Sequence, residues 1–187
     1  MIVICSTSKY LVDAVFKAGG KSLKPAFEKK TKEDPTCPVI SLPAEGSLKS
    51  KVVYFVPWKP NSDQKLLCQS IEQLVTNVIK KAVSENHQSI AFPAIGCGGY
   101  ECSTSLIAKT FANQCQELLQ TYPVSIVFVI QPEKTEIYNE FHQRMSPKGA
   151  AVNKEPPISL TIGNGIIEVK KGDITKQQVN NSSHTFT

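Results

Sequence analysis

Residues 89–111 read SIAFPAIGCGGYECSTSLIAKTF and pass from an apolar run, through three glycines, to an apolar stripe. The run SIAFPAI predicts a buried strand, and the spacing of Leu106, Ile107 and Phe111 predicts one face of a helix. The glycine-rich turn at 96–99 therefore connects a strand directly to a helix. This unit is typical of parallel sheets, so we expect strands and helices to alternate along the rest of the chain.

The alternation is present on both sides of this turn. Short apolar and β-branched runs predict strands over 2–6, 37–43, 51–57, 89–95 and 124–132. Apolar stripes at helical spacing predict helices over 10–20, 22–30, 66–83, 104–119 and 135–145. Because the strands are short, apolar and separated by helices, we expect a three-layer α/β/α domain with a mixed, mainly parallel sheet over residues 1–145.

The remaining residues change in character. Residues 146–157 read SPKGAAVNKEPP, and this composition predicts a linker. Residues 158–187 then start again with a turn, a strand and a turn, like the beginning of a second domain that is cut short.

Composition excludes several classes of function. The 187 residues are 41% hydrophobic and 20% charged, the net charge is +5, and the lysines are scattered, so no face for sequence-specific binding of nucleic acid is indicated. Six cysteines without a CxxC pair predict neither a metal site nor a disulfide framework. No apolar stretch approaches the roughly 20 residues that span a membrane. We expect a nuclear or cytoplasmic protein with reduced thiols and no membrane partner.

The glycine turn is the strongest candidate site. Glycines let the backbone adopt positive φ and approach a ligand, and the following helix offers unpaired N–H groups, so the turn predicts a phosphate site for a nucleotide-like ligand. No Walker loop and no GxGxxG motif is present. Two alternatives stay open: the glycines serve tight packing only, or Cys97 is a nucleophile at a helix N-terminus, with His87 or His142 as partner.

Four stretches together resemble the macrodomain family, whose members bind ADP-ribose. The string IAFPAIGCGGY is similar to the family's strand and distal-phosphate loop. IVICSTS with AVFKAGGKSLKPAFEK resembles its opening strand and helix, VISLPAEGSLKSKVVYFVPW its middle strands, and VSIVFVIQPEKTEIYNEF its last strand and helix. The likeness is greatest to the tandem macrodomains of mono-ADP-ribosyltransferases in the poly(ADP-ribose) polymerase superfamily.

The resemblance implies a set of ligand-binding residues. The phosphate loop would contribute Ile95, Gly96, Cys97, Gly98, Gly99 and Tyr100. Ser6 and Thr7 would border the opposite rim, and Val56 and Pro57 would flank the adenine. Tyr100 is expected to lie near the distal ribose with its hydroxyl toward solvent.

The chain also departs from the family. Cys5 stands where the family has the Asn that faces the distal ribose, and residues 8–11 replace a longer Gly-rich loop. The GDIT motif, whose Asp contacts adenine in the family, is found only in the tail, with Asp173. Residues 1–145 therefore resemble a copy that is truncated at its N-terminus. The tail GDIT resembles the start of a further macrodomain over residues 158–187. An alternative is that the tail strand IIEVKKGDIT folds back, or swaps between two chains in a dimer, which would bring Asp173 to the adenine.

These departures favour a reader of ADP-ribose, free or on mono-ADP-ribosylated proteins, over an enzyme. One alternative is an ADP-ribosyl hydrolase, with Asp13 as its acidic residue. Another is a vestigial scaffold that serves interactions only. No cofactor and no metal is expected, and NAD would be used only by a separate transferase domain of the parent protein.

Overall fold

The structure, a computed structural model, describes residues 1–5, 7–146 and 158–176. Its strands are β1 Ile2–Cys5, β2 Ile40–Pro43, β3 Val52–Val56, β4 Ser89–Phe92, β5 Ser125–Ile130, β6 Ile158–Ile162 and β7 Gly165–Lys171. Its helices are α1 Lys9–Ala18, α2 Leu23–Glu33, α3 Gln64–Ser84, α4 Thr104–Leu119, α5 Thr135–Met145 and the 3-10 helix η1 Ile174–Lys176. Within these residues, no helix combines the length and the apolar character that crossing a membrane requires.

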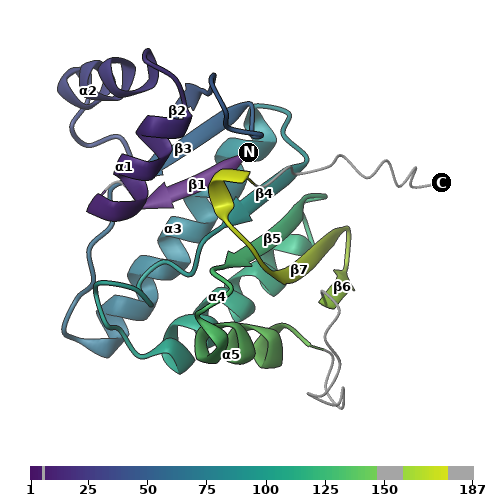
Figure 1. The fold of residues 1–187 in the computed structure, drawn as a ribbon. Helices are drawn as coiled ribbons and strands as arrows, with labels where there is room; N and C mark the ends of the chain where they lie inside the picture. The colour runs from purple at the N-terminus through teal and green to yellow at the C-terminus, as the bar shows by residue number, and fades with distance from the viewer. Residues whose placement is uncertain (6, 147–157, 177–187) are drawn as a thin grey trace.

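All strands belong to one seven-stranded sheet with the order β2-β3-β1-β4-β5-β7-β6 (Figure 1). The five inner strands run parallel, and the two edge strands β2 and β6 are antiparallel to their neighbours. The predicted mixed, mainly parallel sheet is confirmed. The parallel strands all end at the same edge, and their order reverses between β1 and β4, which is where open α/β sheets hold ligands.

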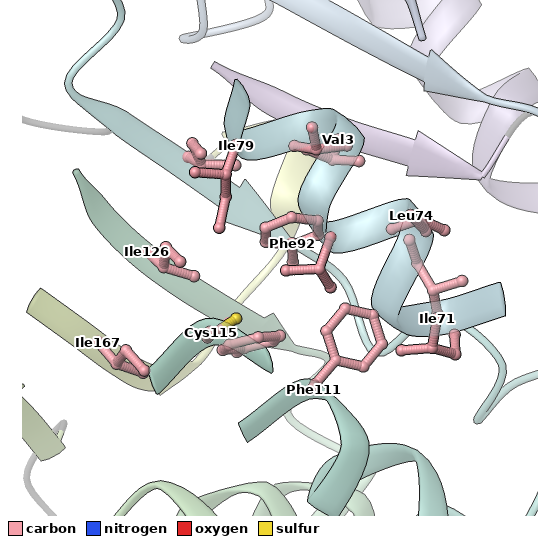
Figure 2. Close-up of a cluster of buried hydrophobic side chains, with 14 of the residues drawn as sticks. Val3, Ile71, Leu74, Ile79, Phe92, Phe111, Cys115, Ile126 and Ile167 are labelled. Atoms are coloured by element: carbon pink, nitrogen blue, oxygen red, sulfur yellow. The ribbon is translucent and has the colours of Figure 1, made fainter. Parts of the chain in front are cut away.

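Helices cover both faces of the sheet. One face packs α3, α4 and α5 against alternate strand residues such as Phe92, Ile126 and Ile167, all fully buried (Figure 2). The other face packs α1, α2 and η1 against the residues between them, including Phe55 and Val127. The predicted three-layer α/β/α arrangement therefore holds.

The tail strands complete this sheet. β7 pairs in parallel with β5 over the register Ser125↔Ile166 to Ile130↔Lys171, and β6 returns antiparallel beside it. The chain thus takes the fold-back arrangement, and it has two tail strands where one was expected. The linker 146–157 lies, from residue 147 on, outside the described residues, as do residues 177–187. That residues 158–187 begin a second copy stays a prediction, although 158–176 lie in the sheet of the first.

The turn between β6 and β7 sits tightly on the end of α4. Gly163 has φ +52°, and an added Cβ would lie 2.8 Å from the Cα of Gln120. The next residue, Asn164, donates its backbone N–H to the carbonyl of Leu119 and its side-chain amide to the carbonyl of Gln120. The hairpin is therefore held by backbone contacts as well as by strand pairing.

We expect Gly163→Ala to lower the free energy of unfolding by about 1–3 kcal/mol, because a Cβ meets backbone there and the φ is unfavourable. The measurement is urea denaturation followed by circular dichroism. Gly172→Ala is the control, since its Cβ would come no closer than 3.5 Å to Val129. Equal stability of the two variants would contradict the tight fit of the hairpin.

Candidate functional site

A cavity of about 600 Å³ opens at the carboxyl ends of the parallel strands. Its walls come from four segments that are far apart in the sequence. They are the start of α1 (Ser8, Tyr10, Leu11, Ala14), the connection from β4 to α4 (93–100), the end of β5 with the start of α5 (129–131, Lys134, Ile137), and the end of β7 with η1 (172–175). All six predicted residues from Ile95 to Tyr100 line this cavity.

The connection from β4 to α4 leaves donors unused. Four of its N–H groups donate back into the connection at 2.8–3.1 Å, those of Ile95, Cys97, Glu101 and Cys102. Four others have no acceptor within the part of the chain that the structure describes, those of Gly96, Gly98, Gly99 and Tyr100. Clustered backbone N–H groups of this kind form a binding place for an anion.

The three glycines of this connection serve different purposes. Gly96 is buried with φ +91°, and an added Cβ would lie 3.2 Å from both Ile107 and Trp58. Gly98 and Gly99 are exposed, have no φ in the left-handed region, and would place a Cβ within 4 Å of nothing. Of the three glycines, only Gly96 therefore uses a positive φ. Gly96 is required by the fold, whereas nothing in the described part of the chain requires a glycine at 98 or 99.

A second set of donors comes from α1. Its N-cap Ser8 makes no side-chain capping hydrogen bond, and its first turn contains no acidic residue. The first N–H groups of an α-helix have no partner within the helix, and the helix dipole makes that end partially positive. Because Ser8, Tyr10 and Leu11 line the cavity, this helix end faces it.

Tyr100 ties the two rims of the cavity together. Its hydroxyl hydrogen-bonds to the side-chain hydroxyl of Thr7 at 2.5 Å and lies 3.2 Å from the carbonyl oxygen of Thr7. Its ring meets the ring of Trp58 edge-on, with centroids 5.7 Å apart. The expectation of a hydroxyl directed to solvent is wrong, because Thr7 at the end of β1 lies within reach. Tyr100 fixes the shape of the glycine connection.

Asp173 stands at the cavity on the segment that follows β7. Its Oδ1 accepts hydrogen bonds from the N–H of Thr175 at 2.9 Å and from the hydroxyl of Thr175 at 2.7 Å. Its Oδ2 lies 3.5 Å from the ammonium of Lys176. Chiefly because of the hydrogen bond from the Thr175 hydroxyl, the pKa of Asp173 is lower than usual. The carboxylate is therefore charged and already engaged in its own turn.

The other predicted site residues do not line the cavity. Val56 is buried in the core below the edge, Pro57 is exposed, and Asp13 is exposed on α1. Thr7 does not line the cavity itself, but it hydrogen-bonds to Tyr100, which does. Ser6 lies outside the described residues.

Several lining residues were not predicted. They are Ser8, Tyr10, Leu11, Ala14, Pro93, Ala94, Val129, Ile130, Gln131, Lys134, Ile137, Gly172, Ile174 and Thr175. Ligands of open α/β sheets bind beyond the carboxyl ends of the parallel strands. Gln131 directly follows such a strand, as the segment with Gly96 does, so the same rule would have predicted it.

Cys97 lacks the properties of a nucleophile. Burial raises the pKa of its thiol to about 12, while a hydrogen bond with Thr104 opposes the rise only in part. The thiol is thus protonated at neutral pH, and the thiolate is the reactive form. The described residues also contain no cluster of His, Cys, Asp and Glu that fits a metal ion.

The chain matches known proteins in sequence and in fold. The family model of the Macro domain matches residues 7–111. Among solved structures, the macrodomain of Oceanobacillus iheyensis with MES bound is 20% identical, with a TM-score of 0.66, covering 77% of this chain and 82% of that one.

Two further structures share the fold. A point mutant of the Oceanobacillus iheyensis macrodomain with ADPR is 23% identical, with a TM-score of 0.63 and coverage of 76% and 83%. The macro domain of ganglioside induced differentiation associated protein 2 is 14% identical, with a TM-score of 0.66 and coverage of 80% and 78%. These likenesses confirm the fold predicted from the sequence.

The two kinds of glycine predict opposite results for the same substitution. Gly96→Ala is expected to lower the free energy of unfolding by about 1–3 kcal/mol, because its φ is unfavourable for alanine and the new Cβ would crowd Ile107 and Trp58. Gly98→Ala is expected to leave it unchanged or to raise it by up to about 1 kcal/mol, since only the unfolded chain loses freedom. Denaturant titration measures both, and a large loss in Gly98→Ala would show an internal need for that glycine.

We expect Cys97 to react slowly with iodoacetamide at pH 8, because a pKa of about 12 leaves roughly one thiol in 10⁴ ionised. The rate should rise about tenfold per pH unit between pH 8 and 10, and mass spectrometry of the labelled peptide measures it. Glutathione in the same solution provides the reference. A rate at pH 8 equal to that of glutathione would reopen the role of Cys97 as a nucleophile.

Proposed function

The chain belongs to the macrodomain family, and on that premise we propose that it is a reader module that binds ADP-ribose, free or attached to proteins. The single observation that carries this proposal is the row of unpaired N–H groups at Gly96, Gly98, Gly99 and Tyr100 along the cavity. A solved relative with ADPR supports the choice of ligand.

The diphosphate lies between the two sets of donors. The glycine connection offers its unpaired N–H groups on one side, and the first turn of α1 offers its own on the other. A hydrogen bond to a charged oxygen contributes about 1.5–3 kcal/mol. Three or four such bonds, less the cost of association, give micromolar affinity.

The adenine lies at the end of the cavity formed by β5, β7 and η1. Val129, Ile130 and Ile174 provide apolar surface there, and Asp173 accepts a hydrogen bond from the adenine amino group. Each carboxylate oxygen accepts more than one hydrogen bond, so its bonds with Thr175 leave room for this one. The tail hairpin thereby supplies a polar contact to the adenine.

Binding without hydrolysis is favoured by the charges of the site. Asp173 and Lys134 are the charged residues among the lining residues described. Asp173 is the carboxylate of this pair, and it is bound to Thr175 and Lys176 instead of being placed to activate a water. Asp13, the acidic residue of the hydrolase alternative, lies outside the lining.

The partners are mono-ADP-ribosylated proteins. Gly98 and Gly99 border open space, so a group attached to the distal ribose can leave the cavity on that side. The parent protein is a tandem-macrodomain ADP-ribosyltransferase of the nucleus or cytoplasm, in which a separate domain uses NAD.

Isothermal titration calorimetry with ADP-ribose tests the proposal. We expect micromolar affinity for ADP-ribose and at least tenfold weaker binding of AMP, which lacks the diphosphate. Gly98→Val should weaken ADP-ribose binding at least tenfold at unchanged stability, because its side chain occupies the open space above the amides. The analogue with hypoxanthine in place of adenine should bind more weakly, since it has no amino group for Asp173.

Equal and negligible heats for ADP-ribose and AMP would contradict the proposal. Release of labelled ADP-ribose from a modified protein would favour the hydrolase alternative, and loss of this release in Asp13→Ala would identify its acid. Failure of every nucleotide to raise the melting temperature would favour the scaffold.

A further inference from the structure

Tyr10 is an exposed aromatic residue at the mouth of the cavity. Its side chain is 89% exposed, yet it lines the cavity together with Leu11 and Ala14. Aromatic side chains offer a large apolar contact area, so one that lines a ligand cavity from its solvent side is a candidate contact. The core does not need this ring, because Val12 and Val15 form the buried face of α1.

No contact within the protein explains the position of Tyr10. Neither its ring nor its hydroxyl makes a ring contact or a hydrogen bond within the described residues. Tyr100 on the opposite rim differs, since its hydroxyl and its ring both have partners. Tyr10 can thus change its side-chain rotamer without loss of a hydrogen bond or ring contact within the described residues.

The direction of the side chain places its ring near the anion donors. Tyr10 is the second residue of α1, and helical side chains point toward the N-terminus of their helix. The ring therefore extends past the first turn, toward the space into which the N–H groups of that turn point. A diphosphate bound at this helix end would lie beneath the ring.

We propose that Tyr10 covers bound ADP-ribose, with its ring packed on the ribose beside the diphosphate. This inference rests on the proposed function and adds a binding residue to it. The ring excludes water from one side of the diphosphate, and hydrogen bonds and charge interactions become stronger where water is excluded. The short segment 8–11, which begins the helix directly after β1, thereby supplies a cover made of one aromatic side chain.

The test compares three variants by calorimetry and stopped-flow kinetics with ADP-ribose. Tyr10→Ala should bind about tenfold more weakly, which corresponds to about 1.4 kcal/mol of lost packing. The loss should appear in the dissociation rate, because the cover acts after the ligand has entered. Tyr10→Phe should bind like the wild type, since the ring and not the hydroxyl makes the contact.

Leu66→Ala is the matched control. Leu66 is the other large hydrophobic residue that is exposed among those described, at 49%, and it does not line the cavity. Its variant should keep the affinity of the wild type. The affinity of Tyr10→Ala should also fall more steeply with salt, because the uncovered diphosphate is screened by ions. Melting temperatures of all variants should agree, since both side chains lie in solvent.

Each outcome decides a separate point. If the wild type does not bind ADP-ribose, the proposed function and the role of Tyr10 both fail. If the wild type binds and Tyr10→Ala matches it in affinity and dissociation rate, the role of Tyr10 alone fails. A loss in Tyr10→Phe equal to that in Tyr10→Ala would replace ring packing with a hydroxyl contact and would also overturn the inference.

Discussion

Parallel pairing of five strands is the constraint on which this structure depends. Because β3, β1, β4, β5 and β7 run in one direction, the segments that follow them leave the sheet at a single edge. Four of those segments form the cavity, although residues 8 and 175 at its extremes are far apart in the chain. The donors of the glycine connection and of α1 face each other only because β1 and β4 are neighbours.

The pairing of β7 with β5 extends this constraint to the tail. Without β7, the edge of β5 would be unpaired and the wall that carries Asp173 and Ile174 would be missing. In β7 the buried residues Ile167 and Val169 alternate with the half-buried residues Glu168 and Lys170, so the strand buries one of its faces more fully than the other. The hairpin therefore contributes to the fold and to the site by the same contacts.

Most of the fold could be predicted from the sequence, because the spacing of apolar residues distinguishes helices from strands. The end of α1 could be predicted as well, because glycine at position 19 is typical of a helix C-terminus. The glycine connection was predicted for the same local reason. What the sequence did not settle was long-range: whether the tail folds back or swaps, and that the Tyr100 hydroxyl finds Thr7, 93 residues away. Val56 and Pro57 were placed at the ligand by resemblance, but the carboxyl end of β3 lies beside β1, outside the cavity.

The glycines of one turn show why a sequence pattern alone cannot assign a ligand. Gly96 satisfies a need of the protein, since its φ is unfavourable for other residues and a Cβ would crowd the side chains of Trp58 and Ile107. Among the described residues, nothing creates such a need at Gly98 and Gly99, and nothing accepts a hydrogen bond from their N–H groups. A residue that neither packing nor backbone geometry explains is best explained by what approaches from outside. The same reasoning applies to Tyr10 across the cavity, so the two rims point independently to one bound molecule.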